Sequence, residues 1–579
     1  MSIFLSLKIL KSQSAALLTI ISTYTLFYCW TFNYAPLWDD SALIEHSVQI
    51  TKAENIQKTF TGHYLEIIDD FNGTTPYYRP VSLSFLMIEY QIFGGTNLNG
   101  YRIIHFLLHL ISGILIFFLS GYLFQSTKLE TSSSVTPALI SSLTFLVLPY
   151  TVDAVLFLTD IGDLMVLCFL ILSLIIAHYY FQKKSILIAT LFFITTTITI
   201  GSKETGLSII PILLLYILFF KPCKSLKDII IPLLITIISA GTYLLGRTAA
   251  LKNNSNHLNI TEAFSTFFSN IMIALRWALI PHPISLQENK FDSGFNYLWF
   301  IGLLLVIALI FTTVKYQKKY SLTLIIIWWW IITISPSILG LQFNNTFDPR
   351  YLYLPGASIA VAAGLIFYKS TKIIRLSMAP LLITLALLTF IRIDVWKSSY
   401  TLWQQEHFNH PKRISALYNY CAATEELKNY NKAVECYLNT KALSSQKKDR
   451  KTEAAANYRL GVLSSKVYKN TTDSIKYLER SIQLYPDFKT FIALGNIFAE
   501  SGNFEEALVN YEEAEKLKPR NFTVYISLAN ALTGLKQFDL ALKNMENARS
   551  LISKSDPKIE EVNRRVKMIS DYQKSIEQK

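Results

Sequence analysis

The sequence is poor in charge and in the short motifs that mark soluble catalysts. Only 16% of its 579 residues are Asp, Glu, Lys or Arg, whereas 51% are hydrophobic. It contains no glycine-rich phosphate loop, no GxSxG nucleophile elbow and no Cys-His pair, so nucleotide-driven and hydrolase functions lose support. Its five cysteines form no CxxC pair and no zinc spacing, and we interpret them as small buried hydrophobic residues.

The excess of positive charge is not arranged for nucleic acid. The formal net charge is +13, but no stripe of Lys and Arg alternates with aromatic residues as a nucleic-acid groove requires. In the first part of the chain the positive residues lie in short loops between apolar blocks, which is a signal of membrane topology. We therefore expect a lipid bilayer as a partner and no nucleic acid.

Apolar blocks long enough to cross a bilayer continue to about residue 396, after which the chain becomes charged and helix-patterned. This predicts a polytopic membrane domain (1–396) and a separate helical domain (397–579), an all-α protein. A span needs about twenty apolar residues, which gives about eleven spans. They lie near 14–34, 101–122, 136–150, 163–181, 185–200, 206–220, 229–246, 298–314, 321–340, 354–368 and 376–394. No cleavage site follows the first, so we expect it to be retained.

The loops alternate in charge. One set is rich in lysine, for example Lys183 and Lys184, and by the positive-inside rule it is cytoplasmic together with the N-terminus. The other set includes a large first loop, 35–100, with an interfacial helix at 81–93 because Glu89 interrupts its apolar run. An odd number of spans places the C-terminal domain outside. This is the periplasmic side of a bacterial inner membrane, or the endoplasmic reticulum lumen in a eukaryote.

The C-terminal domain contains tetratricopeptide repeats. The segment 494–519 has Leu-Gly, an aromatic, Ala, an aromatic, Ala and Pro at the offsets of this repeat, and the pattern recurs with a period of about 34 residues. We predict about four units, the first degenerate and separated by a polar linker at 444–451, with a capping helix over 557–575. Tyr511 and Phe498 are expected to fill the core. The repeats predict a binding surface without naming a ligand.

Two adjacent carboxylates follow the first span, in the segment PLWDDSAL. Asp39 and Asp40 could act as a general base on a hydroxyl, could bind a divalent cation, or could divide these roles. The alternative is that Asp40 caps a following helix. The residues alone leave both alternatives open, and they leave the metal requirement open as well.

Isolated charges mark the other outer boundaries. Arg79 in YYRPVSL and Arg350 in FDPRYLYLP suit a phosphate, with lipid-headgroup contact as the alternative. Lys203 and Glu204 in GSKETG either hold a donor phosphate or neutralise each other. Three further acids, Asp153, Asp160 and Asp163, line one short loop as metal ligands or acceptor contacts. His105 and His109 have helical spacing but lack a third zinc ligand, so packing near the mouth of the site is the favoured interpretation.

Taken in order, these motifs resemble a known family. WDD after the first span, YRP, GYRIIHFLLH, the VDAV…D run, SKETG, PRYLYLP and a tetratricopeptide tail are similar to the transmembrane and tetratricopeptide repeat-containing O-mannosyltransferases and their bacterial relatives. That family belongs to the glycosyltransferase C superfamily. The resemblance covers nearly the whole chain.

The resemblance implies an inverting transfer of a sugar, with mannose the candidate, from a polyprenyl-phosphate donor to Ser or Thr hydroxyls of a protein acceptor. It implies Asp39 or Asp40 as the base. Arg79, Lys203, Arg247 and Arg350 would bind the donor phosphate, and Asp153, Asp163, Glu204 and His109 become substrate-site candidates. The family often has Asn at His105, Glu at Asp153 and Arg at Ile161, and at these three positions this sequence departs from the family's pattern.

Two functions follow from the sequence. The first is the membrane glycosyltransferase, with repeats that recruit the acceptor protein. The second is a membrane-anchored, non-catalytic tetratricopeptide scaffold for protein assembly. A scaffold does not require Asp, Arg and Lys on one side of the membrane, and this grouping favours the enzyme. An ion-coupled transporter would place charges near the bilayer midplane, where few occur.

Overall fold

The chain divides into two compact units, residues 1–402 and 403–579, close to the predicted domain boundary. The computed structural model describes residues 2–37, 40, 44, 50, 53–62, 77–95, 97–125, 134–220, 227–251, 260–281, 284–289, 297–342, 346–552 and 558–577. Across these residues nearly all regular structure is helical, as predicted. The exception is a two-residue antiparallel pair of strands, β1 (Glu288–Asn289) and β2 (Thr346–Phe347).

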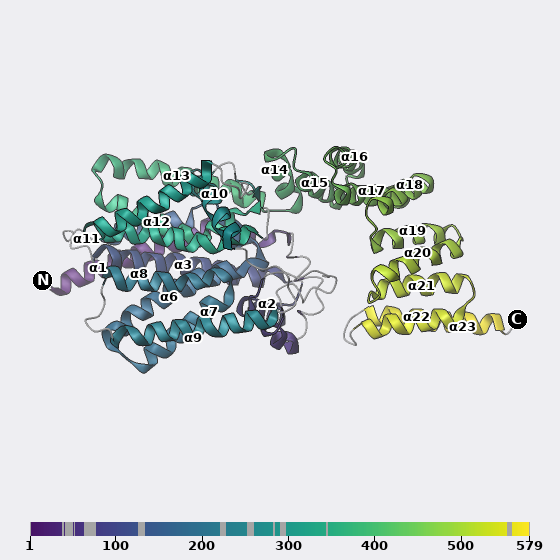
Figure 1. The fold of residues 1–579 in the computed structure, drawn as a ribbon, viewed down its shortest axis with the longest axis horizontal. Coiled ribbons are helices and arrows are strands. Elements are labelled where there is room, and N and C mark those ends of the chain that lie inside the picture. Colours follow the sequence, from purple (N-terminus) through teal and green to yellow (C-terminus); the bar gives the residue numbers. More distant parts are fainter. Residues whose placement is uncertain are drawn as a thin grey trace. The chain divides into compact units, whose positions relative to one another are not determined.

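The first unit is a bundle of long helices whose axes run nearly parallel (Figure 1). Its α-helices are α1 (Ser2–Tyr28), α2 (Pro80–Phe93), α3 (Leu98–Gln125), α4 (Val135–Leu146), α5 (Thr151–Leu156), α6 (Ile161–Lys183), α7 (Ile186–Ser202), α8 (Ile209–Phe220), α9 (Lys227–Ala250), α10 (Ile260–Leu279), α11 (Tyr297–Leu339), α12 (Tyr353–Lys369) and α13 (Lys372–Val395). Short 3-10 helices are η1 (Thr31–Asn33), η3 (Ala53–Phe60), η4 (Leu158–Asp160), η5 (Glu204–Ser208), η6 (Gly340–Gln342) and η7 (Pro349–Leu352).

The centre of this bundle is α6. Most of its side chains are buried, and α3, α7 and α12 pack against it. A helix that is apolar on all sides is stable only where neighbours or lipid cover every face. Peripheral helices such as α11 and α13 instead expose large aliphatic side chains, including Leu304 and Ile373. This distribution suits a bundle surrounded by lipid.

The 43 residues of α11 form two helices that fold back on each other. Tyr320 has non-helical backbone angles (φ −123°, ψ 30°). The indole Nε1 of Trp328 donates a hydrogen bond of 2.9 Å to Oγ1 of Thr313, 15 residues earlier. In a straight helix these residues would be about 22 Å apart, so the chain must reverse near Tyr320. The predicted spans 298–314 and 321–340 are the two arms of this hairpin.

Among the described residues, seven helices are long and apolar enough to cross a membrane. Four shorter apolar helices accompany them, namely Pro80–Phe93, Val135–Leu146, Ile186–Ser202 and Glu204–Phe220. The predicted count of about eleven spans therefore stays a prediction, because the short helices at 136–150, 185–200 and 206–220 fall below the length of a complete span.

The second unit is a series of antiparallel helix pairs. The pairs are α15 (Ile414–Glu426) with α16 (Tyr430–Gln446), α17 (Arg450–Lys466) with α18 (Thr471–Leu484), α19 (Phe488–Glu500) with α20 (Phe504–Leu517), and α21 (Phe522–Gly534) with α22 (Phe538–Leu551). The helix α14 (Ser399–Asn409) contains the unit boundary, and α23 (Lys558–Glu577) packs on α22.

Small residues allow the two helices of a pair to approach. A Cβ atom placed on Gly495 would lie 2.5 Å from the ring of Tyr511, which is itself buried. The aromatic residue thus fills the space that glycine leaves, as the repeat pattern predicts. The predicted polar linker at 444–451 is wrong, because α16 continues to Gln446 and α17 starts at Arg450. Polar residues here form the ends of two helices rather than a separate linker.

The prediction that the cysteines are merely buried hydrophobic residues is also wrong for two of them. Cys421 on α15 and Cys436 on α16 form a disulfide. Cys29 is exposed and Cys168 is buried as a free thiol, while Cys223 lies outside the described residues. Sequence spacing could not reveal the bond, because only the pairing of α15 with α16 brings the two sulfur atoms together.

Candidate functional site

Three of the four predicted phosphate-binding cations line one pocket. Arg79, at the start of α2, Lys203, between α7 and η5, and Arg247, near the end of α9, surround a cavity of about 560 Å³. Glu204 and the rings of Tyr77, Tyr243 and Tyr351 are also in its wall. Residues far apart in the sequence therefore bring three basic side chains to one cavity at the end of an apolar bundle.

Lys203 is held inward by two carboxylates. Its Nζ lies 3.0 Å from Oδ1 of Asp160 and 2.6 Å from Oδ2 of Asp163, and only 4% of the residue is exposed. Lys203 has an extended backbone (φ −160°, ψ 155°) that ends α7 and directs the chain into η5. A buried ammonium ion requires partners of this kind, because desolvation of an unpaired charge costs several kcal/mol.

The glycine of the SKETG motif has a steric role. A Cβ atom on Gly206 would lie 2.0 Å from the carbonyl oxygen of Thr199. No side chain larger than hydrogen fits this distance, so the turn that carries Lys203 and Glu204 requires glycine. The motif is thus explained by backbone contact as well as by charge.

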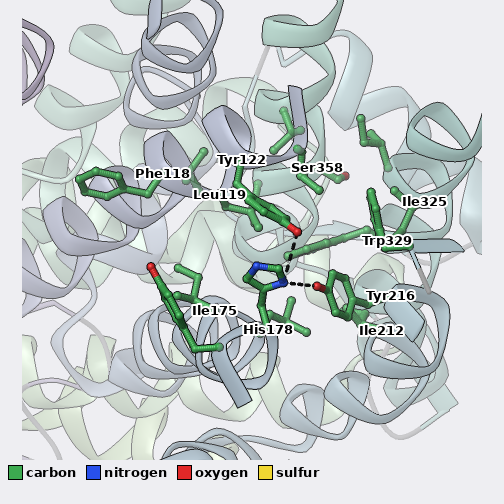
Figure 2. A pocket seen from close by; sticks show the side chains of 18 of the residues that line it. Phe118, Leu119, Tyr122, Ile175, His178, Ile212, Tyr216, Ile325, Trp329 and Ser358 are labelled. Carbon is green, nitrogen blue, oxygen red and sulfur yellow. Dashed lines mark hydrogen bonds between the residues drawn. The ribbon is translucent and has the colours of Figure 1, made fainter. Parts of the chain in front are cut away.

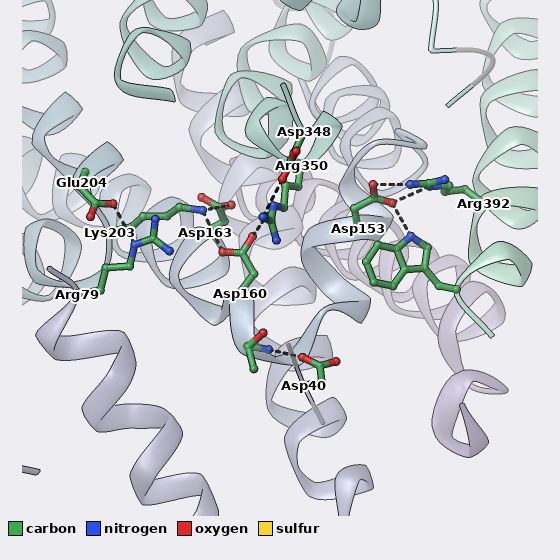
Figure 3. A network of polar contacts seen from close by, with 12 residues as sticks. Asp40, Arg79, Asp153, Asp160, Asp163, Lys203, Glu204, Asp348, Arg350 and Arg392 are labelled. Carbon is green, nitrogen blue, oxygen red and sulfur yellow. Dashed lines mark hydrogen bonds and ion pairs between the residues drawn. The ribbon is translucent and has the colours of Figure 1, made fainter. Parts of the chain in front are cut away.

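Arg350 extends the same network from the opposite side (Figure 3). Its Nε lies 3.5 Å from Oδ2 of Asp160, and its Nη2 lies 2.8 Å from Oδ2 of Asp348. The guanidinium group also lies 4.9 Å from the centre of the Phe157 ring. Burial raises the pKa of Asp348 to about 6, against the opposing effect of the Arg350 charge. Asp160 therefore connects Lys203 with Arg350.

Arg79 and Glu204 form an ion pair in the wall of the pocket. The Nε of Arg79 lies 3.0 Å from Oε2 of Glu204, and the backbone amide of Tyr78 donates to Oε1 of Glu204 at 3.3 Å. The Arg79 guanidinium also stacks 4.6 Å from the centre of the Tyr77 ring. The sequence left open whether Glu204 neutralises Lys203; in the structure it binds Arg79, and Lys203 binds Asp160 and Asp163 instead.

Asp40 is a buried acceptor for a distant segment. Its Oδ1 accepts a hydrogen bond of 2.8 Å from the amide of Thr159, and its Oδ2 accepts one of 3.2 Å from the amide of Leu158. Both amides belong to η4, which leads into α6. Carboxylates that accept backbone N–H groups are stabilised in their charged form and are weaker bases. Asp39, the other predicted base, lies outside the described residues.

Asp153 is occupied by partners that the sequence analysis missed. Arg392 Nε and Nη2 donate to its two oxygens at 2.7 and 2.6 Å, and the indole of Trp396 donates to Oδ1 at 2.7 Å. Both partners come from the end of α13 and its C-cap. An arginine inside the apolar run FIRIDVW was the available signal, because a charge within a span needs a partner. Asp153 does not line the pocket.

The two histidines also lie away from the pocket. His109 Nδ1 is 2.9 Å from the hydroxyl of Tyr353, and His105 Nδ1 is 3.2 Å from the carbonyl oxygen of Val155. Both are fully buried. Nearby, Arg102 was missed by the sequence analysis: it donates to the carbonyl oxygens of Phe32, Tyr34 and Ala35. It therefore anchors the segment that leads from α1 toward the Asp pair.

Within the described residues, no group of three or more His, Cys, Asp or Glu side chains is arranged to hold a metal ion. Of the two residues in the predicted cation site, Asp39 and Asp40, only Asp40 is among the described residues. The two oxygens of Asp40 already accept amide hydrogens, which gives them a role without a metal.

Comparison with known proteins identifies the repeats. Residues 495–535 match the family model described as TPR repeat. No curated protein matches the chain. Among solved structures the chain is similar to MamA (22% identity over 26% of this chain and 79% of that chain, TM-score 0.22). It is also similar to TTC0263, a thermophilic TPR protein in Thermus thermophilus (18% identity over 33% of this chain and 97% of that chain, TM-score 0.24). A third similar structure is yeast Tom70 (11% identity over 80% of this chain and 96% of that chain, TM-score 0.23). The repeat match supports a protein-interaction role for this part of the chain.

Proposed function

We propose that the protein transfers a sugar from a polyprenyl-phosphate donor to Ser or Thr hydroxyls of a protein bound by its repeats. The observation that carries the proposal is the pocket lined by Arg79, Lys203 and Arg247 at the end of the apolar bundle. Guanidinium and ammonium groups bind phosphate, and apolar helices leave room for a lipid tail. The family resemblance supplies the reaction and mannose as the first sugar to test.

The proposed step is a single displacement. The acceptor hydroxyl attacks the anomeric carbon, its proton passes to a carboxylate, and the bond from that carbon to the phosphate oxygen breaks. One displacement inverts the anomeric configuration. The negative charge that develops on the leaving polyprenyl phosphate is stabilised by the pocket cations.

Of the two candidate bases, we assign the proton transfer to Asp39. Both oxygens of Asp40 accept backbone amide hydrogens of η4, which fixes the carboxylate in a structural position. We assign it the role of holding its segment against the start of α6. Asp160 and Asp163 would position Lys203, and Glu204 would position Arg79.

The disulfide supports an extracytoplasmic location for the repeats. Disulfides persist in oxidising compartments and are rare in the cytosol. Cys421 and Cys436 lie in the first repeat pair, and the positive-inside rule with an odd number of spans predicts the same side for this unit. The repeats would then share a compartment with the acceptor protein.

The test is sugar transfer in membranes that contain the full chain. Labelled polyprenyl-phosphate mannose and a pool of Ser/Thr peptides are supplied to wild type, Asp39→Asn, Asp40→Asn and Arg247→Gln. We expect Asp39→Asn to abolish transfer and Arg247→Gln to raise the KM for the donor. The matched control is Arg276→Gln, because Arg276 pairs with Glu288 at an exposed position outside the pocket. Equal transfer by wild type and Asp39→Asn would rule out this base.

The alternative is a membrane-anchored scaffold, which the repeat match also supports. A scaffold would show no transfer with any polyprenyl donor, yet would retain partner proteins through its repeats. Partner capture that persists in Asp39→Asn, without transfer by wild type, would favour the scaffold.

A further inference from the structure

A second pocket lies in the same bundle, away from the cations. It is formed by the C-terminal parts of α3, α6 and α8 together with α11 and α12, and has a volume of about 400 Å³. Aliphatic and aromatic side chains such as Leu119, Ile175 and Trp329 make up most of its wall (Figure 2). No Asp, Glu, Lys or Arg is among the described residues that line it.

This pocket lies toward the opposite end of the bundle from the ion-pair network. Asp163, in the network, and His178, in the pocket, are both on α6, and their separation in sequence corresponds to about 22 Å along the helix. The lysine-rich loop at 183–184 follows shortly after His178 and is predicted to be cytoplasmic. The second pocket therefore belongs to the inner half of the predicted membrane domain.

Its polar groups converge on one histidine. His178 Nδ1 lies 2.6 Å from the hydroxyl of Tyr216 and 3.2 Å from that of Tyr122, and its Nε2 lies 2.8 Å from Nε2 of Gln182. Figure 2 shows the two tyrosine hydroxyls approaching the imidazole from different helices. A single Nδ1 either donates one hydrogen or accepts one, and Tyr216 is the nearer partner. Because the amide nitrogen of Gln182 can only donate, His178 Nε2 accepts from it and Nδ1 carries the hydrogen. Nδ1 therefore donates to a tyrosine oxygen, and the hydroxyl hydrogen of Tyr122 is available for another acceptor.

Hydrogen bonds that hold the helices together explain only part of this arrangement of polar groups beside an apolar pocket. Hydrogen bonds among Tyr122, His178 and Tyr216 do join α3, α6 and α8. However, hydrogen bonds between helices do not require an adjacent apolar pocket of this size. A ligand that fills the space with hydrocarbon and accepts a hydrogen bond satisfies both features.

We propose that this pocket binds an uncharged lipid whose head group carries a hydroxyl. The head group oxygen accepts from Tyr122, and the hydrocarbon chain lies against the apolar wall. Without Lys or Arg among the described lining residues, a phosphate or carboxylate head group would leave its charge unpaired. The site is thus distinct in ligand chemistry from the cationic pocket, and it does not depend on the proposed transfer reaction.

The test uses photoreactive, alkyne-tagged long-chain lipids on the full-length protein in nanodiscs. The probes share one chain and carry an alcohol, a carboxylate or a phosphate head group. We expect the alcohol to label peptides of α3, α6 and α8 in preference to the other two probes. Stronger labelling of this pocket by the phosphate or carboxylate probe would overturn the proposal.

Two variants locate the labelling. Tyr122→Phe removes one hydrogen bond and should lower labelling by the alcohol roughly fivefold, whereas Leu119→Trp should block the cavity. Tyr297→Phe is the matched control, since Tyr297 is exposed and does not line the pocket. The thermal midpoint of each variant is measured in parallel. Undiminished alcohol labelling in a folded Tyr122→Phe variant would show that the tyrosine serves only to join helices and would overturn the proposal.

Discussion

At the scale of single residues, buried carboxylates in the first unit have very different surroundings. Asp153, Asp160 and Asp163 each face a basic side chain within hydrogen-bond distance. Glu89, on α2, is only 2% exposed, and neither of its carboxylate oxygens has a hydrogen-bond partner among the described residues. Burial raises the pKa of Glu89 well above its usual value. The same kind of group is therefore paired with a basic side chain in one place and disfavoured as an ion in another.

Glu89→Gln should stabilise the protein near neutral pH. The raised folded-state pKa of Glu89 means that the contribution of this group to stability is largest below its unfolded pKa, and is lost as pH rises from there through the folded value. The slope in that window is at most about 1.4 kcal/mol per pH unit. The variant lacks this loss, so its thermal midpoint should exceed that of wild type as pH increases. Glu54→Gln, at an exposed position, is the control, and identical pH profiles for wild type and Glu89→Gln would contradict the assignment.

Asp153→Asn should lower stability, because it leaves the guanidinium of Arg392 buried without a countercharge. Removing one partner of a buried ion pair costs about 3–5 kcal/mol. The double variant Asp153→Asn with Arg392→Gln removes both charges and should recover part of the loss. Thermal unfolding in detergent measures both effects. A stable Asp153→Asn protein that has lost sugar transfer would instead support the original expectation of a substrate contact.

At the scale of elements, the disulfide fixes the first repeat pair. Cys421 on α15 and Cys436 on α16 are separated by 15 residues. From the next pair, Arg459 on α17 forms an ion pair with Glu425 on α15. The hydroxyl of Tyr437 donates a hydrogen bond to Oε2 of Glu425. Covalent and ionic contacts thus strengthen the unit with the weakest repeat sequence. The later units rely on the fit of small residues against aromatic rings.

Loss of this disulfide should destabilise the repeat unit. A crosslink that closes a loop of this length contributes about 3 kcal/mol. The variant with both Cys421→Ser and Cys436→Ser should unfold at a lower denaturant concentration, and reductant should lower the stability of wild type in the same way. Cys29→Ser, which alters an exposed free thiol, is the control. Full alkylation of Cys421 and Cys436 in protein isolated without reductant would contradict the pairing.

At the scale of the whole molecule, the proposed function requires the cationic pocket and the repeats to lie on the same side of the predicted membrane domain. The loop between α12 and α13 carries Lys369, Lys372 and Arg375 and is predicted to be cytoplasmic. The cationic pocket and the repeats are predicted to lie outside. The hairpin within α11 is essential to this alternation, because a single long helix would reverse the side of every later segment.

Labelling with a membrane-impermeant maleimide tests this topology. In a background with Cys29, Cys168 and Cys223 changed to Ser, single cysteines replace Thr371 and Ser501, both exposed. We expect Ser501→Cys to react from outside and Thr371→Cys only in inside-out vesicles. Reaction of both positions from the same side would show that α13 does not cross the membrane.

Many residues of the site could be predicted one by one from the sequence, but the ion pairs and hydrogen bonds between them could not. Arg79 and Lys203 were identified from charges at span boundaries and Arg247 from the family resemblance, and the structure places them in one pocket. The partner of Glu204, the anchoring of Asp153 by Arg392, and the contact of Asp40 with η4 were not predictable. Each joins segments that are 118 or more residues apart, and periodicity carries no information over such separations.

The sequence by itself determined the helical class, the division into an apolar and a repeat unit, and the residues that carry unusual charge. These properties follow from local composition and period, because burial in lipid or in a repeat core acts on each helix separately. Only the tertiary structure decided which charge pairs with which, that Cys421 meets Cys436, and that a second, uncharged pocket surrounds His178. Those outcomes depend on how helices pack side by side, and packing is decided by the whole set of side-chain shapes together.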